Sequence, residues 1–227
     1  MLSAFAVARA RRQICLTALF FLLIAPMANA ETLSEADVKN LLARIRENRI
    51  TQADFQEQRV MRLMKKPIVS SGKAWFQPPN KFRREVRGSS PSITVSDGQQ
   101  LWIYYPSFKS AERYSLGTRS PLDSVIASIN AALNLENIEN TFHITATRTG
   151  NGYELALIPR TAAMKRSFQK LDLRINDNLQ VERTDMLQPN GDRIVTVYTN
   201  QKRAPVPPST FEFTPPPGTD ITTPLGR

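Results

Sequence analysis

Residues 92–105 read SITVSDGQQLWIYY, and this stretch decides the fold class. β-Branched and aromatic residues fill two runs, 92–96 and 100–105, on either side of Asp97 and Gly98. Such residues favour strands, and Asp-Gly favours a tight hairpin because both residues tolerate a positive φ. The stretch therefore predicts two antiparallel strands joined by a short turn.

The same pattern continues in both directions along the chain. Short runs of strand-forming residues alternate with turn residues such as Gly, Asn, Asp and Pro, which predicts an antiparallel meander. A mainly β fold of the α+β class follows. We expect strands at 51–64, 68–76, 81–87, 92–96, 100–105, 141–148, 153–159, 166–176, 179–188 and 192–200.

Two segments instead show the spacing of an amphipathic helix. Ser34 and Asp37 stand three residues apart, as in a capping box with Asp replacing Glu, and predict a helix over 35–47. Its apolar face is formed by Val38, Leu41, Leu42 and Ile45. Ser120 and Pro121 begin a second predicted helix over 121–133, with its apolar face at Leu122, Val125, Ile126, Ile129 and Leu133.

The first thirty residues have the pattern of an export signal. Arg9, Arg11 and Arg12 precede an apolar run that is too short to span a bilayer, and small residues follow at 28–30. We expect cleavage after Ala30, which leaves one domain over 31–227. Cleavage also removes Cys15, the only cysteine of the chain. The simplest location for such a protein is the periplasm of a Gram-negative bacterium.

Basic residues outnumber acidic ones by 30 to 20, which gives a formal net charge of +10. This excess indicates an anionic neighbour, either nucleic acid, an anionic lipid surface or an acidic protein. Because export separates the protein from cellular nucleic acid, we expect no nucleic-acid partner. A basic face directed at anionic lipid or at an acidic receptor remains, on a protein that we expect to be a monomer.

Residues that carry catalytic chemistry are scarce. His143 is the only histidine and lies in a predicted strand, where it is interpreted as an ordinary strand residue. One histidine and one cysteine exclude histidine-based zinc sites and cysteine catalysis, and the chain has no phosphate-binding glycine loop. We therefore expect no enzyme activity, no metal and no cofactor.

Several predicted strands carry large apolar residues near their centres. A curved antiparallel sheet with helices over its mouth can enclose an apolar ligand space. The alternative is that the helices and the sheet fill each other as an ordinary core. Composition alone leaves these two interpretations open.

Five strings of sequence, in this order, point to a known family. They are FQEQ at 55–58, PNKFR at 79–83, SDG at 96–98, LWIY at 101–104 and FEFTPP at 211–216. Each string alone is weak, but their order and spacing after an export signal resemble the LolA family of outer-membrane lipoprotein carriers. The resemblance covers nearly all of the chain after residue 30.

The resemblance implies a single unclosed antiparallel β-barrel whose amphipathic helices form a lid over an apolar cavity. It also implies a carrier of acylated lipoproteins, which takes them from an inner-membrane ABC exporter to an outer-membrane acceptor. Phe82 matches the inward-facing phenylalanine of a Phe-x-Trp strand in the family. The expected ligand-binding residues of cavity and lid are Leu41, Leu42, Ile45, Trp75, Phe82, Arg84, Val86, Ile93, Val95, Trp102, Leu122, Val125, Ile126 and Ile129.

Two positions depart from the family pattern. Arg84 stands where the tryptophan of the Phe-x-Trp strand is expected, and Pro78 stands where some members carry an arginine that holds the lid by hydrogen bonds. Arg84 can place a cation at the cavity wall or at its rim. A related carrier of another amphiphile, such as a glycolipid, therefore stays open, as does an exported binding or structural module with a filled barrel.

Overall fold

The computed structural model describes residues 31–116 and 138–224, which form one large β-sheet with short helices. The helices are α1 (Glu35–Glu47), α3 (Ile138–Thr141) and α4 (Ala162–Ser167), with 3-10 turns η1 (Pro106–Phe108) and η2 (Pro208–Phe211). The strands are β1 (Glu31–Thr32), β2 (Gln52–Val60), β3 (Ile68–Gln77), β4 (Lys81–Arg87), β5 (Ser92–Ser96), β6 (Gln100–Tyr105), β7 (Ser110–Ser115), β8 (Phe142–Thr149), β9 (Gly152–Pro159), β10 (Lys170–Ile175), β11 (Val181–Leu187), β12 (Arg193–Lys202) and β13 (Asp220–Thr222).

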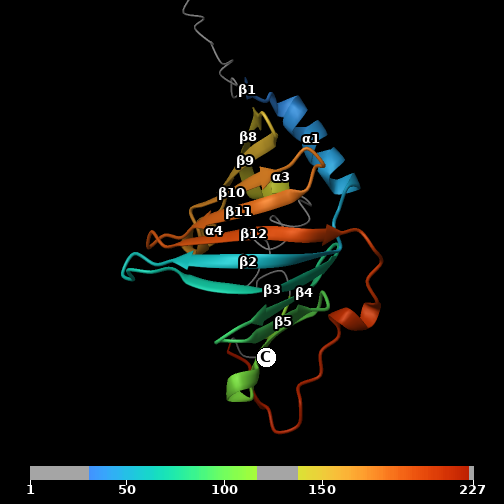
Figure 1. The fold of residues 1–227 in the computed structure, drawn as a ribbon, viewed down its shortest axis with the longest axis vertical. Coiled ribbons are helices and arrows are strands. Elements are labelled where there is room, and N and C mark those ends of the chain that lie inside the picture. Colours follow the sequence, from blue (N-terminus) through green and yellow to red (C-terminus); the bar gives the residue numbers. More distant parts are fainter. Residues whose placement is uncertain (1–30, 117–137, 225–227) are drawn as a thin grey trace, which may run out of the picture.

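The strand order in the sheet is β1-β8-β9-β10-β11-β12-β2-β3-β4-β5-β6-β7-β13. All neighbours are antiparallel except β13, which pairs with β7 in parallel. The first and last strands of this order are not paired with each other, so the sheet is curved but unclosed (Figure 1). The mainly β, unclosed antiparallel architecture expected from the sequence is confirmed.

The hairpin at Asp97 and Gly98 joins β5 to β6 where the sequence predicts it. Gly98 has a φ of +95°, a conformation that costs glycine little free energy because it has no Cβ atom. Asp97 contributes differently from the prediction, because its φ is not positive. Its carboxylate instead accepts hydrogen bonds from the backbone N–H groups of Gln99 and Gln100, both at 2.7 Å.

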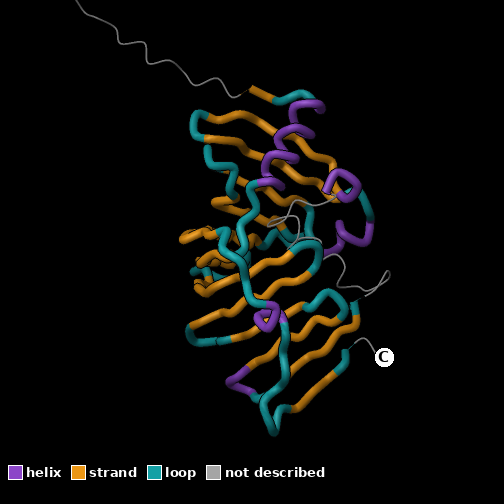
Figure 2. The backbone as a smooth tube through the Cα atoms, turned by 90° about the vertical axis from the view of Figure 1, so that its right-hand side faces the viewer, coloured by secondary structure: helices purple, strands orange, loops and turns teal. Residues whose placement is uncertain are grey.

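Helix α1 has the predicted bounds and the predicted cap. The Ser34 hydroxyl accepts a hydrogen bond from the Asp37 N–H at 3.2 Å and donates one to the Asp37 carboxylate at 2.6 Å. The helix lies across one face of the sheet (Figure 2). Arg46 fastens its last turn to α3 through two hydrogen bonds to the Glu139 carboxylate, at 2.6 and 2.7 Å.

Several predicted boundaries are wrong. The strand predicted over 51–64 ends at Val60, and residues 61–64 belong to the exposed tip of the β2–β3 hairpin. Helix α4 occupies residues that overlap the strand predicted from 166, and β7 and β13 are missed. Six-residue helices and three-residue edge strands are too short for periodicity to reveal. The export signal at 1–30 and the helix predicted over 121–133 lie outside the described residues.

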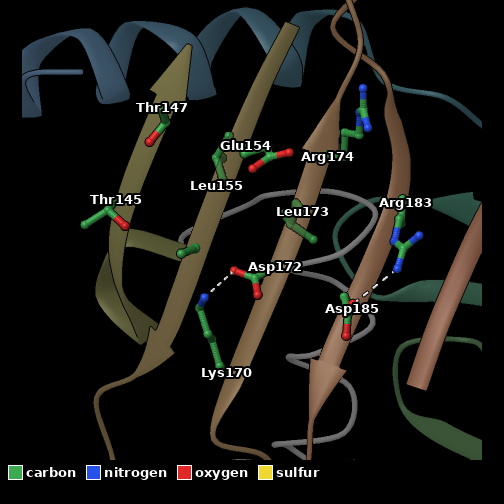
Figure 3. A pocket seen from close by; sticks show the side chains of 11 residues that line it. Thr145, Thr147, Glu154, Leu155, Lys170, Asp172, Leu173, Arg174, Arg183 and Asp185 are labelled. Carbon is green, nitrogen blue, oxygen red and sulfur yellow. Dashed lines mark hydrogen bonds and ion pairs between the residues drawn. The ribbon is translucent and has the colours of Figure 1, made fainter. Parts of the chain in front are cut away.

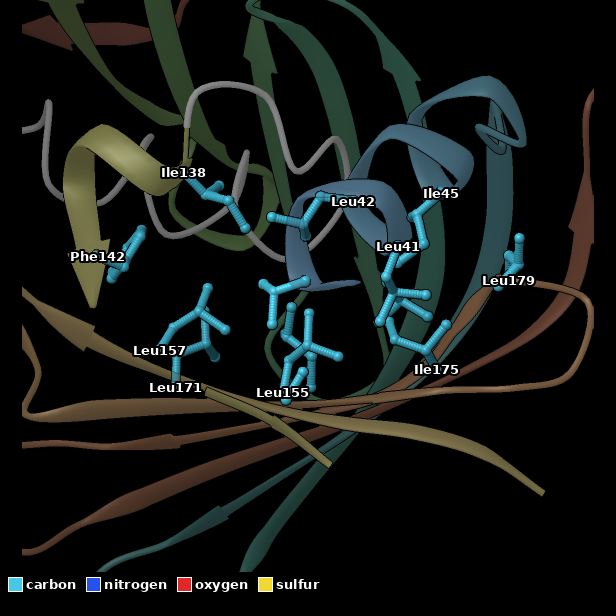
Figure 4. Close-up of a cluster of buried hydrophobic side chains, with 14 of the residues drawn as sticks. Leu41, Leu42, Ile45, Ile138, Phe142, Leu155, Leu157, Leu171, Ile175 and Leu179 are labelled. Carbon is cyan, nitrogen blue, oxygen red and sulfur yellow. The ribbon is translucent and has the colours of Figure 1, made fainter. Parts of the chain in front are cut away.

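The concave face of the sheet carries two apolar clusters. The larger one lies between α1 and strands β8–β11 and includes Leu42, Leu157 and Ile175, none of which is exposed to solvent (Figure 4). The smaller one lies on β2, β3, β4 and β6, around Phe55, Phe76 and Phe82. Over the described ranges, no helix is long and apolar enough to cross a membrane.

Candidate functional site: a cavity on the concave face

A cavity of about 350 Å³ lies on the concave face, beside the α1 cluster. Strands β2 to β6 form one side and β10 to β12 form the other, with residues from the end of α4 between them. Most of the lining is apolar. The lining residues are Phe55, Glu57, Arg59, Ala74, Phe76, Phe82, Arg84, Thr94, Leu101, Ile103, Ser167, Phe168, Leu171, Thr184, Met186, Gln188, Ile194, Thr196 and Tyr198.

An ion pair stands in the middle of this apolar wall. Arg84 on β4 donates a hydrogen bond of 2.7 Å to Glu57 on β2, reaching across β3. The other carboxylate oxygen of Glu57 accepts a hydrogen bond of 2.9 Å from Arg59. Among the lining residues these three alone are charged, so the cavity holds two guanidinium groups and one carboxylate.

Gly72 on β3 makes room for this arrangement. It pairs with Phe55 on one side and with Val86 on the other. A Cβ atom at Gly72 would lie 2.7 Å from the Phe55 ring and 1.9 Å from the backbone oxygen of Glu85. The Phe55 ring fills the space above the glycine, and the Arg84 guanidinium lies over that ring at 4.2 Å from its centroid.

Burial changes the proton equilibria of two cavity residues. Burial lowers the pKa of the Arg84 guanidinium, and the nearby Glu57 carboxylate raises it and so opposes that effect. Burial raises the pKa of the Tyr198 hydroxyl to about 12, although Arg84 and a hydrogen bond with Thr184 favour its ionisation. The cavity therefore keeps polar groups that are largely shielded from water.

Of the predicted site residues, Phe82 and Arg84 line the cavity. Val86 lies on the same face of β4 two residues further on, packed against the smaller cluster. Residues 122, 125, 126 and 129, predicted as the second lid helix, lie outside the described residues. The ligand-binding role of all of these residues stays a prediction.

Four other predicted residues, Trp75, Ile93, Val95 and Trp102, face the opposite side of the sheet. Residues paired across antiparallel strands share a face. Trp75 and Val95 both pair with Arg83, the neighbour of Phe82 and Arg84, so they point away from the cavity. Trp102 pairs with Val95, and Ile93 pairs with Glu85, so both share this outer face. The expectation that these four residues line the cavity is corrected.

The C-terminal tail gives these outward apolar residues a partner. Phe213 packs against Trp102 and Tyr104, with ring centroids 5.8 and 5.6 Å apart. Arg83 donates a hydrogen bond of 3.3 Å to the Thr210 carbonyl, which fastens the tail to β4. Trp102 and Tyr104 on the outer face of β6 therefore pack under the tail.

The predicted lid residues of α1, Leu41, Leu42 and Ile45, lie in the larger cluster and do not line the cavity. In Figure 4 they point from the helix toward Leu155, Leu157 and Ile175 of the sheet. Helix α1 therefore covers the β8–β10 part of the concave face and fills it. The cavity begins where this filling ends, at Phe168 and Leu171.

A second hollow, of about 410 Å³, lies on the outer face of β8–β11 and has a different chemistry (Figure 3). It is lined by paired charges, such as Lys170 with Asp172 at 2.9 Å and Arg183 with Asp185 at 3.3 Å. Within residues 31–116 and 138–224, no three His, Cys, Asp or Glu side chains gather as metal ligands. His143 is exposed on β8, 3.4 Å from Arg160.

Glu57, Arg59 and Tyr198 line the cavity but are not among the site residues predicted from the sequence. The signal that could have revealed the two β2 residues is strand alternation, because it places Phe55, Glu57 and Arg59 on one face of β2. The tertiary pairing of β2 with β12 then brings Tyr198 opposite Phe55. Charged residues at alternate positions look like a solvated face until the curvature of the sheet is known.

The fold and the cavity together define the class: an unclosed single β-sheet with a helix across its concave face and an apolar cavity beside that helix. Residues 47–214 match the family described as "Outer membrane lipoprotein carrier protein LolA". The chain belongs to this family.

Two relatives agree with this assignment, and a solved structure shares the fold. The chain is 26% identical over 179 residues to an outer-membrane lipoprotein carrier protein of Dechloromonas aromatica, covering 78% of this chain and 83% of that protein. It is 30% identical over 153 residues to one of Chromobacterium violaceum, covering 67% and 71%. The crystal structure of an uncharacterized conserved protein from Thermus thermophilus shares the fold, with a TM-score of 0.50, 14% identity and coverage of 82% and 99%.

Proposed function

We propose that this protein is a periplasmic carrier that binds the acyl chains of lipoproteins released from the inner membrane and delivers them to the outer membrane. The observation that carries the proposal is the apolar cavity between the two halves of the sheet. Family membership supports the same role, because the relatives are named as lipoprotein carriers. An inner-membrane ABC exporter and an outer-membrane acceptor are the partners that this role requires.

The size of the cavity limits how cargo is held. Ligand pockets usually measure about 300–1,000 Å³, so 350 Å³ is small for a lipid anchor. We infer that the cavity holds part of the anchor as it stands and widens to take more.

Incomplete burial of the anchor also suits a carrier that must release its cargo. Burying roughly 45 methylene groups of a triacylated anchor would gain on the order of 35 kcal/mol against water. Non-covalent binding has a practical ceiling of about 20 kcal/mol, and a carrier near that ceiling would not release cargo. Acyl chains are buried in apolar surroundings both in a bilayer and in the cavity, so the free energy of apolar burial nearly cancels when cargo moves between them. Small polar contributions, such as that of the Glu57–Arg84 pair, then set the direction of transfer.

The test is uptake of a fluorescent fatty-acyl probe by the purified protein at micromolar concentration. Ala74→Leu adds a side chain to the cavity wall and should weaken probe binding about tenfold or more. Ala156→Leu places the same side chain on the outer face of β9 and should leave binding unchanged. Absence of uptake by the unsubstituted protein would overturn the proposal.

Delivery needs its own measurement, made with donor membranes that carry an acylated lipoprotein and with outer-membrane vesicles as acceptors. We expect the purified protein to increase transfer of the acylated lipoprotein and not of a variant that lacks the acylated cysteine. Mass spectrometry of lipids that co-purify with the protein should show acyl-modified peptides.

A second cargo class is favoured by the charge of the cavity. Two guanidinium groups face one carboxylate there, and Arg59 is about half exposed, at 54% of its side-chain surface. An amphiphile with an anionic head group, such as an acidic glycolipid, would find its counter-charge at Arg59. If probes with anionic heads bind more tightly than neutral ones, and Arg59→Gln removes the difference, this second class gains support over the first.

A further inference from the structure

The two ends of the strands differ sharply in the chemistry of their connections. Because neighbouring strands are antiparallel, the connections alternate between one end and the other. We name the basic end after the five described connections at 61–67, 88–91, 106–109, 160–169 and 188–192. We name the opposite end after those at 78–80, 97–99, 150–151 and 176–180.

Charge separates the two ends. The connections of the basic end contain seven basic side chains and one acidic side chain. The four tight turns of the opposite end contain no basic side chain and two acidic ones, Asp97 and Asp177, and the longer connections there, 48–51 and 203–207, add only Arg49 and Arg203. The one acidic residue of the basic end, Asp192, is already engaged, because it accepts hydrogen bonds from the Arg62 N–H at 2.9 Å and from Asn190 at 2.8 Å.

Exposed apolar side chains gather at the same end. Leu63 at the tip of the β2–β3 hairpin is 99% exposed, and Phe108 in η1 is 79% exposed. Met61 and Met64 flank Leu63 and are also exposed. The hairpin projects from the sheet beside the β11–β12 connection, which Arg62 contacts through the Asn190 carbonyl at 3.3 Å (Figure 1).

Lys65 and Lys66 complete the hairpin tip. Both are exposed, and neither has an ion-pair partner among the described residues. Met61, Leu63 and Met64 form a group of exposed apolar side chains, and lysines beside such a group are unusual for a protein–protein contact, whose centre is depleted of lysine. The same combination is typical of segments that insert a leucine below the head groups of an anionic lipid surface.

We propose that the basic end is a docking surface for an anionic lipid bilayer, with Leu63 inserted below the head groups and Lys65 and Lys66 paired with lipid phosphates. Charge complementarity commits the proposal to lipid as the occupant. An acidic protein partner is the alternative that the test must separate. Docking itself needs no cargo and is independent of the proposed carrier function.

The position of the cavity gives this docking a use. Arg59, Gln188 and Ile194 line the cavity and lie at or beside the basic end. A protein docked by the hairpin tip therefore turns this end of the cavity toward the bilayer. If the proposed carrier function holds, an acyl chain that leaves the cavity here has a short path into lipid.

The experiment measures binding of the purified, cargo-free protein to phosphatidylcholine vesicles with and without 40% phosphatidylglycerol, by co-sedimentation at about 0.1 M salt. We expect binding to the anionic vesicles only, weakening as salt rises. Lys65→Gln/Lys66→Gln should reduce binding about 25-fold, since each surface charge is worth about fivefold. The matched control, Lys202→Gln/Arg203→Gln, removes two exposed charges away from the basic end and should change binding little.

Insertion of Leu63 is tested separately. With Cys15 replaced by serine, a polarity-sensitive dye on Leu63→Cys should shift to the blue on anionic vesicles, whereas the dye on Gln99→Cys at the opposite end should not. Leu63→Ser should weaken vesicle binding about tenfold, and Val197→Ser, which removes an apolar side chain exposed in mid-strand, should not.

Three results would overturn the proposal: no binding to anionic vesicles, equal binding by Lys65→Gln/Lys66→Gln, or no dye shift at Leu63→Cys. Binding of the tip to an acidic protein without binding to vesicles would assign it to a receptor instead. Acyl-probe uptake should be unchanged in all tip variants. A failure of the carrier proposal would therefore appear in probe uptake, and a failure of the docking proposal in vesicle binding.

Discussion

The concave face of one sheet is filled in one half and hollow in the other. In the half formed by β8–β11, helix α1 supplies four buried aliphatic side chains, and they meet a continuous apolar surface (Figure 4). In the half formed by β2–β6, the same face carries Glu57, Arg59 and Arg84 among its aromatic residues. Here the wall leaves a cavity.

The difference teaches that the residues on a strand face decide whether the concave face of a curved sheet is filled. An apolar strand face gains free energy by packing against an amphipathic helix. A strand face with an ion pair gains less from being covered, because complete covering would remove two charges from water. Their mutual attraction offsets that desolvation cost only when the geometry of the pair is ideal. We infer that the Glu57–Arg84 pair helps to keep its half of the concave face open, and the following predictions test this explanation.

The largest effect should come from truncating the filled half. Leu42 is fully buried under α1, so Leu42→Ala should lower the free energy of unfolding by about 2–5 kcal/mol through lost burial and a new cavity. Urea denaturation followed by circular dichroism measures this loss. Acyl-probe affinity per folded molecule should stay the same. A loss below 1 kcal/mol would mean that the α1 half is not tightly packed.

Breaking the ion pair should have the next largest effect. Glu57→Gln leaves the Arg84 charge without its carboxylate, and because Arg84 keeps a quarter of its side-chain surface exposed we expect a loss of about 2 kcal/mol. Replacing both residues, Glu57→Leu/Arg84→Leu, should return stability to within about 1 kcal/mol of the starting protein. If Glu57→Gln leaves stability unchanged, solvent screens the pair and it does not hold the cavity open.

The same alanine-to-leucine substitution, made once in each half, should show the difference between the filled half and the hollow half directly. Ala146 lies in the filled cluster and Ala74 lies at the cavity wall, and both are almost fully buried. Ala146→Leu should cost about 1–3 kcal/mol by overpacking, while Ala74→Leu should cost less than about 1 kcal/mol because the cavity accepts the added volume. Thermal denaturation of the two variants side by side measures the difference. Equal costs would contradict the contrast between the halves.

The smallest effect concerns alkaline pH. Burial raises the pKa of Tyr198 to about 12, whereas the same group in an unfolded chain ionises near 10. Below pH 10 both states keep the proton; between pH 10 and 12 the unfolded state releases it first, so the free energy of unfolding falls as the pH rises. Tyr198→Phe should make this fall shallower, measured as the urea midpoint between pH 9 and 12.

A comparison variant accounts for a second tyrosine with a raised pKa, the partly buried Tyr114. Burial and a hydrogen bond of 2.6 Å to Glu112 raise the pKa of Tyr114 to about 12 as well. Tyr114→Phe should therefore remove a second part of the alkaline fall, and the double variant should remove both. If Tyr198→Phe changes nothing in this range, the Tyr198 hydroxyl is not shielded by the cavity wall.

Sequence patterns predicted local structure well where the elements were long and their signals strong. Helix α1 has the predicted bounds because Ser34, Asp37 and four spaced apolar residues all indicate the same helix. Strands β4, β5 and β6 also have their predicted bounds, since clear turn residues separate them. Helix α4 and strand β13 were missed because so few residues carry little periodicity and depend on tertiary contacts.

The candidate site was predicted only in part, for a physical reason visible at Phe82 and Val95. Both are large, apolar and almost fully buried, and the sequence treats them alike. In the sheet, Phe82 faces the cavity, while Val95 pairs with Arg83 and faces outward. Outward apolar residues looked like cavity residues because the tail that carries Phe211 and Phe213 was not expected to cover them.

By itself, the sequence determined most of the succession of strands, the capped amphipathic helix and the family resemblance, because these depend on neighbours within a few residues or on the order of motifs. Only the tertiary structure decided which face of each strand is concave, where α1 fills the sheet, and that Glu57 meets Arg84 across β3. Those outcomes depend on strand pairing and sheet curvature, which join residues far apart in the chain and leave no local mark in its sequence.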